Sequence, residues 1–172
     1  FPPASNIKFK VRLTEQFFKV TNKKVDNNSI STDYFRLFPM SGVFIETPIK
    51  HKLSELLITP KLSFIVNSGQ SNSNKISNEE STNNAYDIIT QTYLNRYSGT
   101  DKLDNSKRIN YGINLIKDKI EFNISQYYEF EKNSNYHKEM GNKDYLSDLL
   151  SKISYNSNKN RLTYSLRYDE HN

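Results

Sequence analysis

Apolar and polar side chains alternate residue by residue over several long stretches of this chain. In residues 7–13, the apolar Ile7, Phe9, Val11 and Leu13 are separated by Lys8, Lys10 and Arg12. A period of two places successive side chains on opposite faces of a β-strand. We therefore expect each such stretch to form a strand with one apolar face and one polar face.

Seven segments carry a strand pattern and give an all-β prediction. The predicted strands are residues 7–20, 33–46, 56–67, 108–115, 120–130, 149–155 and 161–168. The second pattern is the weakest, because Pro39 and Gly42 favour a bulge or an irregular stretch there. Helical spacing is confined to residues 53–57 and 145–150, and each segment is too short to form a stable helix alone.

The connections between these strands differ in length in a regular way. Residues 47–52, Asp118 and residues 157–160 are expected to make short turns, and Asp118 to close a hairpin. Long polar connections are expected at 21–31, 67–107 and 131–147. The resulting antiparallel up-and-down meander, with short turns at one end and long loops at the other, is typical of outer-membrane barrels. The alternation alone also allows a soluble sandwich or a lipocalin-like barrel.

Composition excludes several classes of protein. Only 35% of the 172 residues are hydrophobic, but 12 Tyr and 10 Phe favour half-buried strands over disorder. The formal charge of +5 is scattered, which gives nucleic-acid binding little support, and the absence of Cys excludes thiol catalysis and disulfides. Apolar runs do not exceed three residues, so no transmembrane helix or signal-peptide core is expected. The chain begins with Phe, which suggests a processed chain or an internal fragment.

No cluster of residues suggests catalysis, a metal site or a cofactor. The three histidines, His51, His137 and His171, are far apart in predicted turns and loops. The acidic residues Glu79, Glu80 and Asp87 lack a calcium-binding spacing, and we expect them to be solvated. Six cations lie on the polar faces of strands, where a barrel would expose them to a wet interior and to anionic groups such as phosphorylated lipid. They are Lys8, Lys10, Arg12, Arg108, Arg161 and Arg167.

Four segments resemble one known family. NRYSGTD at 95–101, followed by KRINYG at 107–112, resembles the Arg-Phe-Ser-Gly-x-Asp…Arg-x-x-Tyr-Gly pattern of the LPS-assembly protein family LptD, also called the organic solvent tolerance family. LITPKL at 57–62, SNEES at 77–81 and FNISQYYEF at 122–130 are similar to other family segments in the same order. These collinear matches cover about residues 35–130, while 1–34 and 131–172 agree only in strand pattern.

The resemblance implies a non-enzymatic role in inserting lipopolysaccharide into the outer leaflet of the Gram-negative outer membrane. The family's barrel is plugged by the lipoprotein LptE and receives lipopolysaccharide through a periplasmic jellyroll domain from a bridge protein, LptA or its equivalent. Residues 1–172 would be a single partial domain, a middle-to-late segment of that barrel wall, without the jellyroll. Because the family's cysteines are missing, its oxidative maturation does not carry over. Another outer-membrane barrel, such as a porin or secretion pore, and a soluble β-sheet binding module remain the alternatives.

The alternation then assigns faces. We expect one set of residues to contact outer-membrane lipid: Ile109, Tyr111, Ile113, Leu115, Ile120, Phe122, Ile124, Leu162, Tyr164 and Leu166. The set expected to face the lumen is Arg108, Asn110, Asn114, Glu121, Asn123 and Arg161. The family-motif residues Asn95, Arg96, Ser98, Gly99 and Asp101 are expected to shape an extracellular loop, with Gly99 allowing a turn that other residues resist. Their expected contribution is to loop stability more than to substrate contact.

Overall fold

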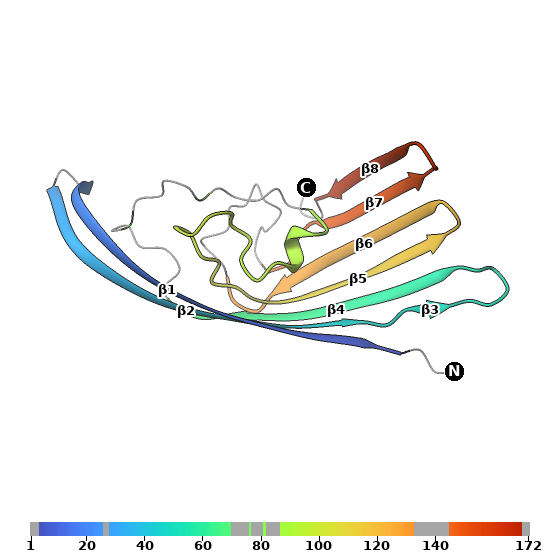
Figure 1. Cartoon of the computed structure of the whole chain (residues 1–172), viewed down its shortest axis with the longest axis horizontal. Helices are drawn as coiled ribbons and strands as arrows, with labels where there is room; N and C mark the ends of the chain where they lie inside the picture. Colours follow the sequence, from blue (N-terminus) through green and yellow to red (C-terminus); the bar gives the residue numbers. More distant parts are fainter. Residues whose placement is uncertain are drawn as a thin grey trace.

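A curved antiparallel sheet forms most of the chain (Figure 1). The computed structural model describes residues 4–25, 28–69, 76, 81, 87–132 and 145–169. Its strands are β1 (Asn6–Val25), β2 (Asn28–Glu46), β3 (Ile49–Lys50), β4 (Leu57–Asn67), β5 (Lys107–Lys117), β6 (Ile120–Glu129), β7 (Leu149–Asn156) and β8 (Arg161–Tyr168), and a short 3₁₀ helix, η1, spans Thr90–Thr92. The all-β prediction is confirmed.

The strands follow one another in space as they do in sequence. The order across the sheet is β1-β2-β4-β5-β6-β7-β8, and the two-residue β3 pairs with β4 beside this path. Every pairing is antiparallel, which confirms the up-and-down meander. Strands β1 and β8 are the edges of the described sheet, so the sheet is open, consistent with part of a barrel.

Short turns gather at one end of the sheet, as expected (Figure 1). Asp118 closes the β5–β6 hairpin with a φ of 51°, a left-handed conformation that Asp tolerates better than most residues. Ser157 closes the β7–β8 hairpin, and its N–H donates to the carbonyl of Asn160 at 2.8 Å. The long connection from β4 to β5 starts at the other end.

Three predictions about the first half of the chain were wrong. Residues 21–25 and 28–31 belong to β1 and β2 instead of a loop, because the two strands pair along their whole length despite a register shift between Val20 and Lys23. Neither Pro39 nor Gly42 makes a bulge. Pro39 lies just beyond the segment of β2 that pairs with β4, where a strand tolerates proline. Residues 47–52 were expected to form only a turn, but they include the two-residue strand β3, which brings the number of described strands to eight instead of the predicted seven.

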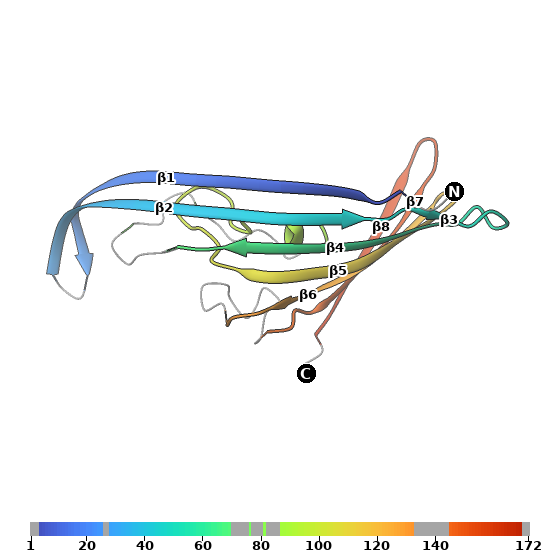
Figure 2. The same cartoon turned by 90° about the horizontal axis from the view of Figure 1, so that it is seen from below.

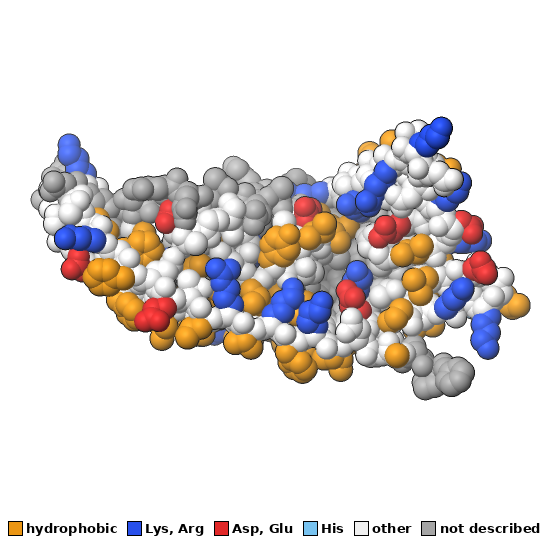
Figure 3. Space-filling view, in the orientation of Figure 1, with side chains coloured by type: hydrophobic (Ala, Val, Ile, Leu, Met, Phe, Trp, Pro, Cys, Tyr) orange, Lys and Arg blue, Asp and Glu red, His pale blue; other side chains and the backbone are white. Residues whose placement is uncertain are grey.

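The register divides the side chains between two faces. The pairing of β5 to β8 places all ten predicted lipid-facing residues on the same face of the sheet, which is the convex face. The six predicted lumen-facing residues lie on the opposite, concave face. Figure 3 shows hydrophobic side chains along the convex border and charged side chains above them.

In the part of the chain that the structure describes, no helix is long and apolar enough to span a membrane.

Candidate functional site

The concave face is covered over part of its area by the connection between β4 and β5, residues 87–106, which we call the inner loop (Figure 1). Phe38 and Met40 of β2 pack with Leu103 and Leu94 of this loop into a small buried cluster. Gly42 makes room for it, because a Cβ there would come within 3.0 Å of a Leu94 methyl group. The inner loop is therefore held against the sheet by apolar packing.

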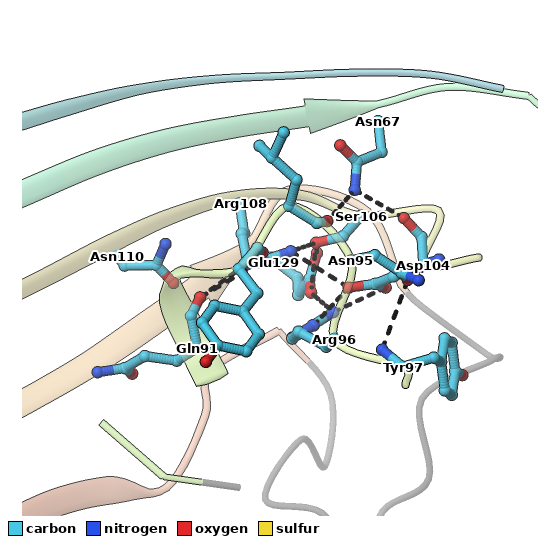
Figure 4. A network of polar contacts seen from close by, with 12 residues as sticks. Asn67, Gln91, Asn95, Arg96, Tyr97, Asp104, Ser106, Arg108, Asn110 and Glu129 are labelled. Atoms are coloured by element: carbon cyan, nitrogen blue, oxygen red, sulfur yellow. Dashed lines mark hydrogen bonds and ion pairs between the residues drawn. The ribbon is translucent and has the colours of Figure 1, made fainter. Parts of the chain in front are cut away.

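Buried ion pairs hold the same loop from its other side (Figure 4). The Arg96 Nε donates to Asp104 Oδ2 at 2.5 Å, and its Nη2 donates to Asp104 Oδ1 at 3.1 Å and to Glu129 Oε1 at 2.6 Å. The side chains of all three residues are fully buried. Arg96 thus links the middle of the inner loop to the end of the loop near β5 and to the end of β6.

Arg108 joins this cluster from β5. Its Nη1 donates to Ser106 Oγ at 2.7 Å and to Asp104 Oδ2 at 3.3 Å, while Nε donates to the carbonyl of Gln91 at 3.3 Å. Its Nη2 donates to the carbonyls of Gln91 and Tyr93. Ser106 Oγ lies 2.9 Å from both carboxylate oxygens of Glu129. We call Arg96, Asp104, Ser106, Arg108 and Glu129 the ion network.

The charges of the ion network balance, because two guanidinium groups face two carboxylates. Burial alone would lower the pKa of Arg96, but Asp104, then Tyr127 and Glu129, raise it well above its ordinary value. The Arg96 guanidinium also lies 5.0 Å from the centre of the Tyr127 ring. A buried charge cluster of this kind favours one arrangement of its loop, since a displaced partner would leave an uncompensated charge.

The family-motif residues all lie in the inner loop. Asn95 Oδ1 accepts the N–H of Asp104 at 2.9 Å, and Gly99 has a φ of 74°, as its predicted turn requires. The carbonyl of Asp101 accepts from Arg36 Nη1 at 2.9 Å, which ties the loop to β2. Ser98 is half-buried. This geometry supports a role in loop stability, and it places the motif over the concave face of the sheet.

A pocket with a mixed polar and apolar lining lies next to the ion network. Its volume is about 330 Å³, and it is lined by residues of β2, β4, β5 and β6, by Ile88 and Gln91 of the inner loop, and by Lys152 and Arg161 of the last hairpin. Amide and charged side chains together form its polar lining. Asn114 Nδ2 donates to Glu121 Oε1 at 2.9 Å and to Asn123 Oδ1 at 2.8 Å.

Sequence reasoning missed most of the ion network. Arg108 was assigned to the polar face, but its hydrogen bonds to Asp104 and Ser106 and its position opposite Glu129 were not anticipated. The sequence did contain the information to predict one pair of this network. A tight turn at Asp118 fixes the register of the β5–β6 hairpin, and this register places Arg108 directly opposite Glu129. The concave face also carries apolar residues under the inner loop, among them Phe38, Met40 and Ile65, which the alternation does not reveal.

The other candidate residues that the structure describes, Asp87 and His51, make only local contacts. Asp87 accepts the N–H groups of Ile89 and Thr90 at 2.7 Å and so caps the turn that leads into η1. His51 lies 2.8 Å from Ser54 Oγ in the β3–β4 turn. Glu79, Glu80, His137 and His171 lie outside the described residues, and among the residues described no acidic or histidine group could hold a metal ion.

The chain matches the model of a known protein family over nearly its whole length. The model of the family described as LptD, LPS transport system D, matches residues 2–172. No curated protein matches the chain.

Proposed function

The chain belongs to the LptD family, and from this we propose that its sheet is a segment of an outer-membrane barrel wall along which lipopolysaccharide moves toward the outer leaflet. Membership of this family implies a role in the transport of lipopolysaccharide to the outer membrane. The family is one of transport and assembly proteins, and it is not an enzyme family. The finer proposal concerns how this sheet takes part.

The length of the apolar band on the convex face supports a membrane wall. On β2 the band runs from Phe35 to Ile45 without a charged residue, and on β1 it runs from Ile7 to Phe17, where Glu15, opposite Leu37, is the one charged residue on this face. Ten residue steps at about 3.3 Å cover roughly 33 Å along the strand. At a strand tilt of about 40°, this is a height of about 25 Å, which is the height of the apolar band in outer-membrane barrels.

A facing pair of opposite charges follows where this band ends. Lys19 lies directly opposite Asp33, two residues beyond the aromatic pair Phe17 and Phe35 on the same face. Aromatic residues mark the membrane interface in such barrels, and charges are tolerated beyond it. The β1–β2 hairpin continues past the end of β4 (Figure 2), and we propose that this extension stands outside the bilayer.

The concave face has the properties of a hydrated wall. Lys8, Lys10 and Arg12 are exposed along β1 on this face, and polar side chains continue across β4 to β8. Cations there can meet the phosphate groups of lipopolysaccharide through charge-assisted hydrogen bonds. We propose that this face lines the lumen and that the ten residues of the convex set contact lipid.

The open edges suggest how the segment is completed. An exposed strand edge in water invites pairing with other chains, and closure into a barrel removes both edges. We propose that residues 1–172 are one segment of a larger barrel domain in the outer membrane. We further propose, from the family alone, that a lipoprotein equivalent to LptE fills the lumen and that a bridge protein equivalent to LptA delivers the lipopolysaccharide. The family match favours this proposal over a porin, a secretion pore or a soluble binding module.

Photocrosslinking in cells tests the assignment of faces. A benzophenone amino acid would replace Arg12 on the concave face or Phe9 on the convex face of the same strand in the full-length protein. Phe9 lies in the half of the band nearer the short turns, which we place in the inner leaflet, away from the lipopolysaccharide of the outer leaflet. We expect lipopolysaccharide adducts at position 12 and far fewer at position 9. Lys10 and Ile7 form a second, equivalent pair. Equal adduct yields on both faces, or adducts at the convex positions alone, would contradict the proposal.

A further inference from the structure

The short turns bring together lysines that lie far apart in the sequence. The segment around β3, the β5–β6 turn and the β7–β8 turn all lie at one end of the sheet, where Figure 3 shows Lys and Arg side chains at the right of the view. Residues 47–56, 117–120 and 157–160, which form this end, contain two carboxylates and five lysines, so they account for +3 of the chain's formal charge of +5. We call the five lysines the basic end: Lys50, Lys52, Lys117, Lys119 and Lys159.

The lysines of the basic end are exposed and have no ion-pair partner among the residues that the structure describes. All five residues are exposed. Elsewhere in the sheet, Lys61 lies 3.5 Å from a carboxylate oxygen of Glu46, but no described carboxylate forms such a pair with a lysine of the basic end. Like charges that gather without counter-charges create a positive potential that attracts an anionic partner.

Lys117 places the basic end at the border of the convex apolar band. It is the next residue after Leu115 on this face of β5, and it lies directly opposite Ile120 of β6. Ile120 in turn lies opposite Tyr155 of β7, which is exposed on the same face. An aromatic residue at the end of an apolar band marks the membrane interface of a barrel, and a lysine at that level extends its ammonium group toward the lipid headgroups.

We propose that the basic end binds the anionic headgroups of phospholipids, such as phosphatidylglycerol, in the inner leaflet of the outer membrane. Each lysine ammonium group would donate hydrogen bonds to a phosphate oxygen of a headgroup. The inference rests on one part of the proposed function, because the turns meet a lipid surface only if the convex face spans the membrane.

The arrangement of the lysines favours a lipid surface over an acidic protein. They stand on three separate hairpins along the rim of the sheet, which suits a surface made of many small anions better than one acidic peptide. The long connection from β4 to β5 starts at the opposite end of the sheet (Figure 1). The headgroups that meet the basic end are therefore distinct from the lipopolysaccharide of the outer leaflet.

Native mass spectrometry of the full-length protein tests the inference. The purified protein in detergent is titrated with phosphatidylglycerol and separately with phosphatidylethanolamine, which carries no net charge. Tighter binding of phosphatidylglycerol is expected. Lys117→Gln combined with Lys119→Gln should weaken that binding roughly 25-fold, a factor of about five for each lysine. Lys19→Gln combined with Lys24→Gln is the matched control, because it removes two exposed lysines from the far half of β1 and should leave the affinity unchanged.

The outcomes separate the two proposals. Equal affinities for the two phospholipids, or unchanged phosphatidylglycerol binding in a Lys117→Gln, Lys119→Gln variant whose circular dichroism matches that of the unmodified protein, overturns the inference. If that happens while position 12 still crosslinks to lipopolysaccharide, only this inference fails. If the lysine-dependent preference is present but crosslinks at position 12 are absent, the basic end stands and the proposed transport role fails.

A polyglutamate peptide probes the competing partner. Lysine-dependent binding of this peptide, without a preference for phosphatidylglycerol, would assign the basic end to an acidic protein and overturn the inference.

Discussion

Replacing Arg96 by Met should release the inner loop from the sheet. The change removes three charge-assisted hydrogen bonds, two to Asp104 and one to Glu129, in a cluster with no solvent exposure. It leaves two buried carboxylates facing Arg108 alone. Removing one partner of a buried ion pair costs about 3–5 kcal/mol, because the remaining charge is left uncompensated. We expect Arg96→Met to lower the free energy of unfolding by about that amount.

Urea unfolding of the full-length protein in lipid vesicles, followed by circular dichroism, measures this loss. Trypsin provides a local readout, because release of the loop would expose the half-buried Lys102 to cleavage. Lys61→Met is the matched control. Its ion pair with Glu46, at 3.5 Å, leaves both side chains nearly half-exposed, and such surface pairs contribute only about 0–1 kcal/mol.

A double-mutant cycle isolates the pair itself. Glu129→Gln in the Arg96→Met background restores charge balance, leaving Arg108 with Asp104, so the two effects should be less than additive by about 0.5–3 kcal/mol. If Arg96→Met behaves like Lys61→Met in both urea and trypsin, the ion network does not hold the loop. Strict additivity of Arg96→Met and Glu129→Gln would likewise refute the coupling inferred from their 2.6 Å contact.

Three further predictions use the same unfolding assay. Ile113→Arg, near the middle of β5 on the convex face, should cost about 2–4 kcal/mol in vesicles, whereas Ile120→Arg, beside the turn, should cost about 0–1 kcal/mol; equal costs would contradict a lipid-facing band. Gly112→Ala should cost about 1–3 kcal/mol, because the new Cβ meets a backbone carbonyl at 2.6 Å. Gly42→Ala, which meets only side-chain ends, should cost less, and the reverse order would refute the argument. Gly99→Ala should cost about 1–2 kcal/mol because of its φ of 74°, and a stabilising effect would show that the turn relaxes.

The sheet itself could be predicted from the sequence because its signal is local. In an extended backbone, side-chain direction depends only on position, so the alternation in residues 108–115 and 120–130 assigns each residue to a face without knowledge of its neighbours. The hairpin at Asp118 adds the register, and with it the pairing of Arg108 with Glu129. The same argument failed at 21–31, since two strands that pair through their backbones need no apolar face.

The inner loop depended on tertiary structure. Arg96 and Glu129 are 33 residues apart, and nothing in a period of two shows that a polar connection folds back over the concave face. Asn67 illustrates the same limit, because its amide donates to the carbonyls of Leu94 and Asp104, far along the chain. Alternation thus determined which residues share a face, whereas the pocket and the ion network arise only where the curved sheet and the inner loop bring distant donors and acceptors together, in the ion network without any contact with water.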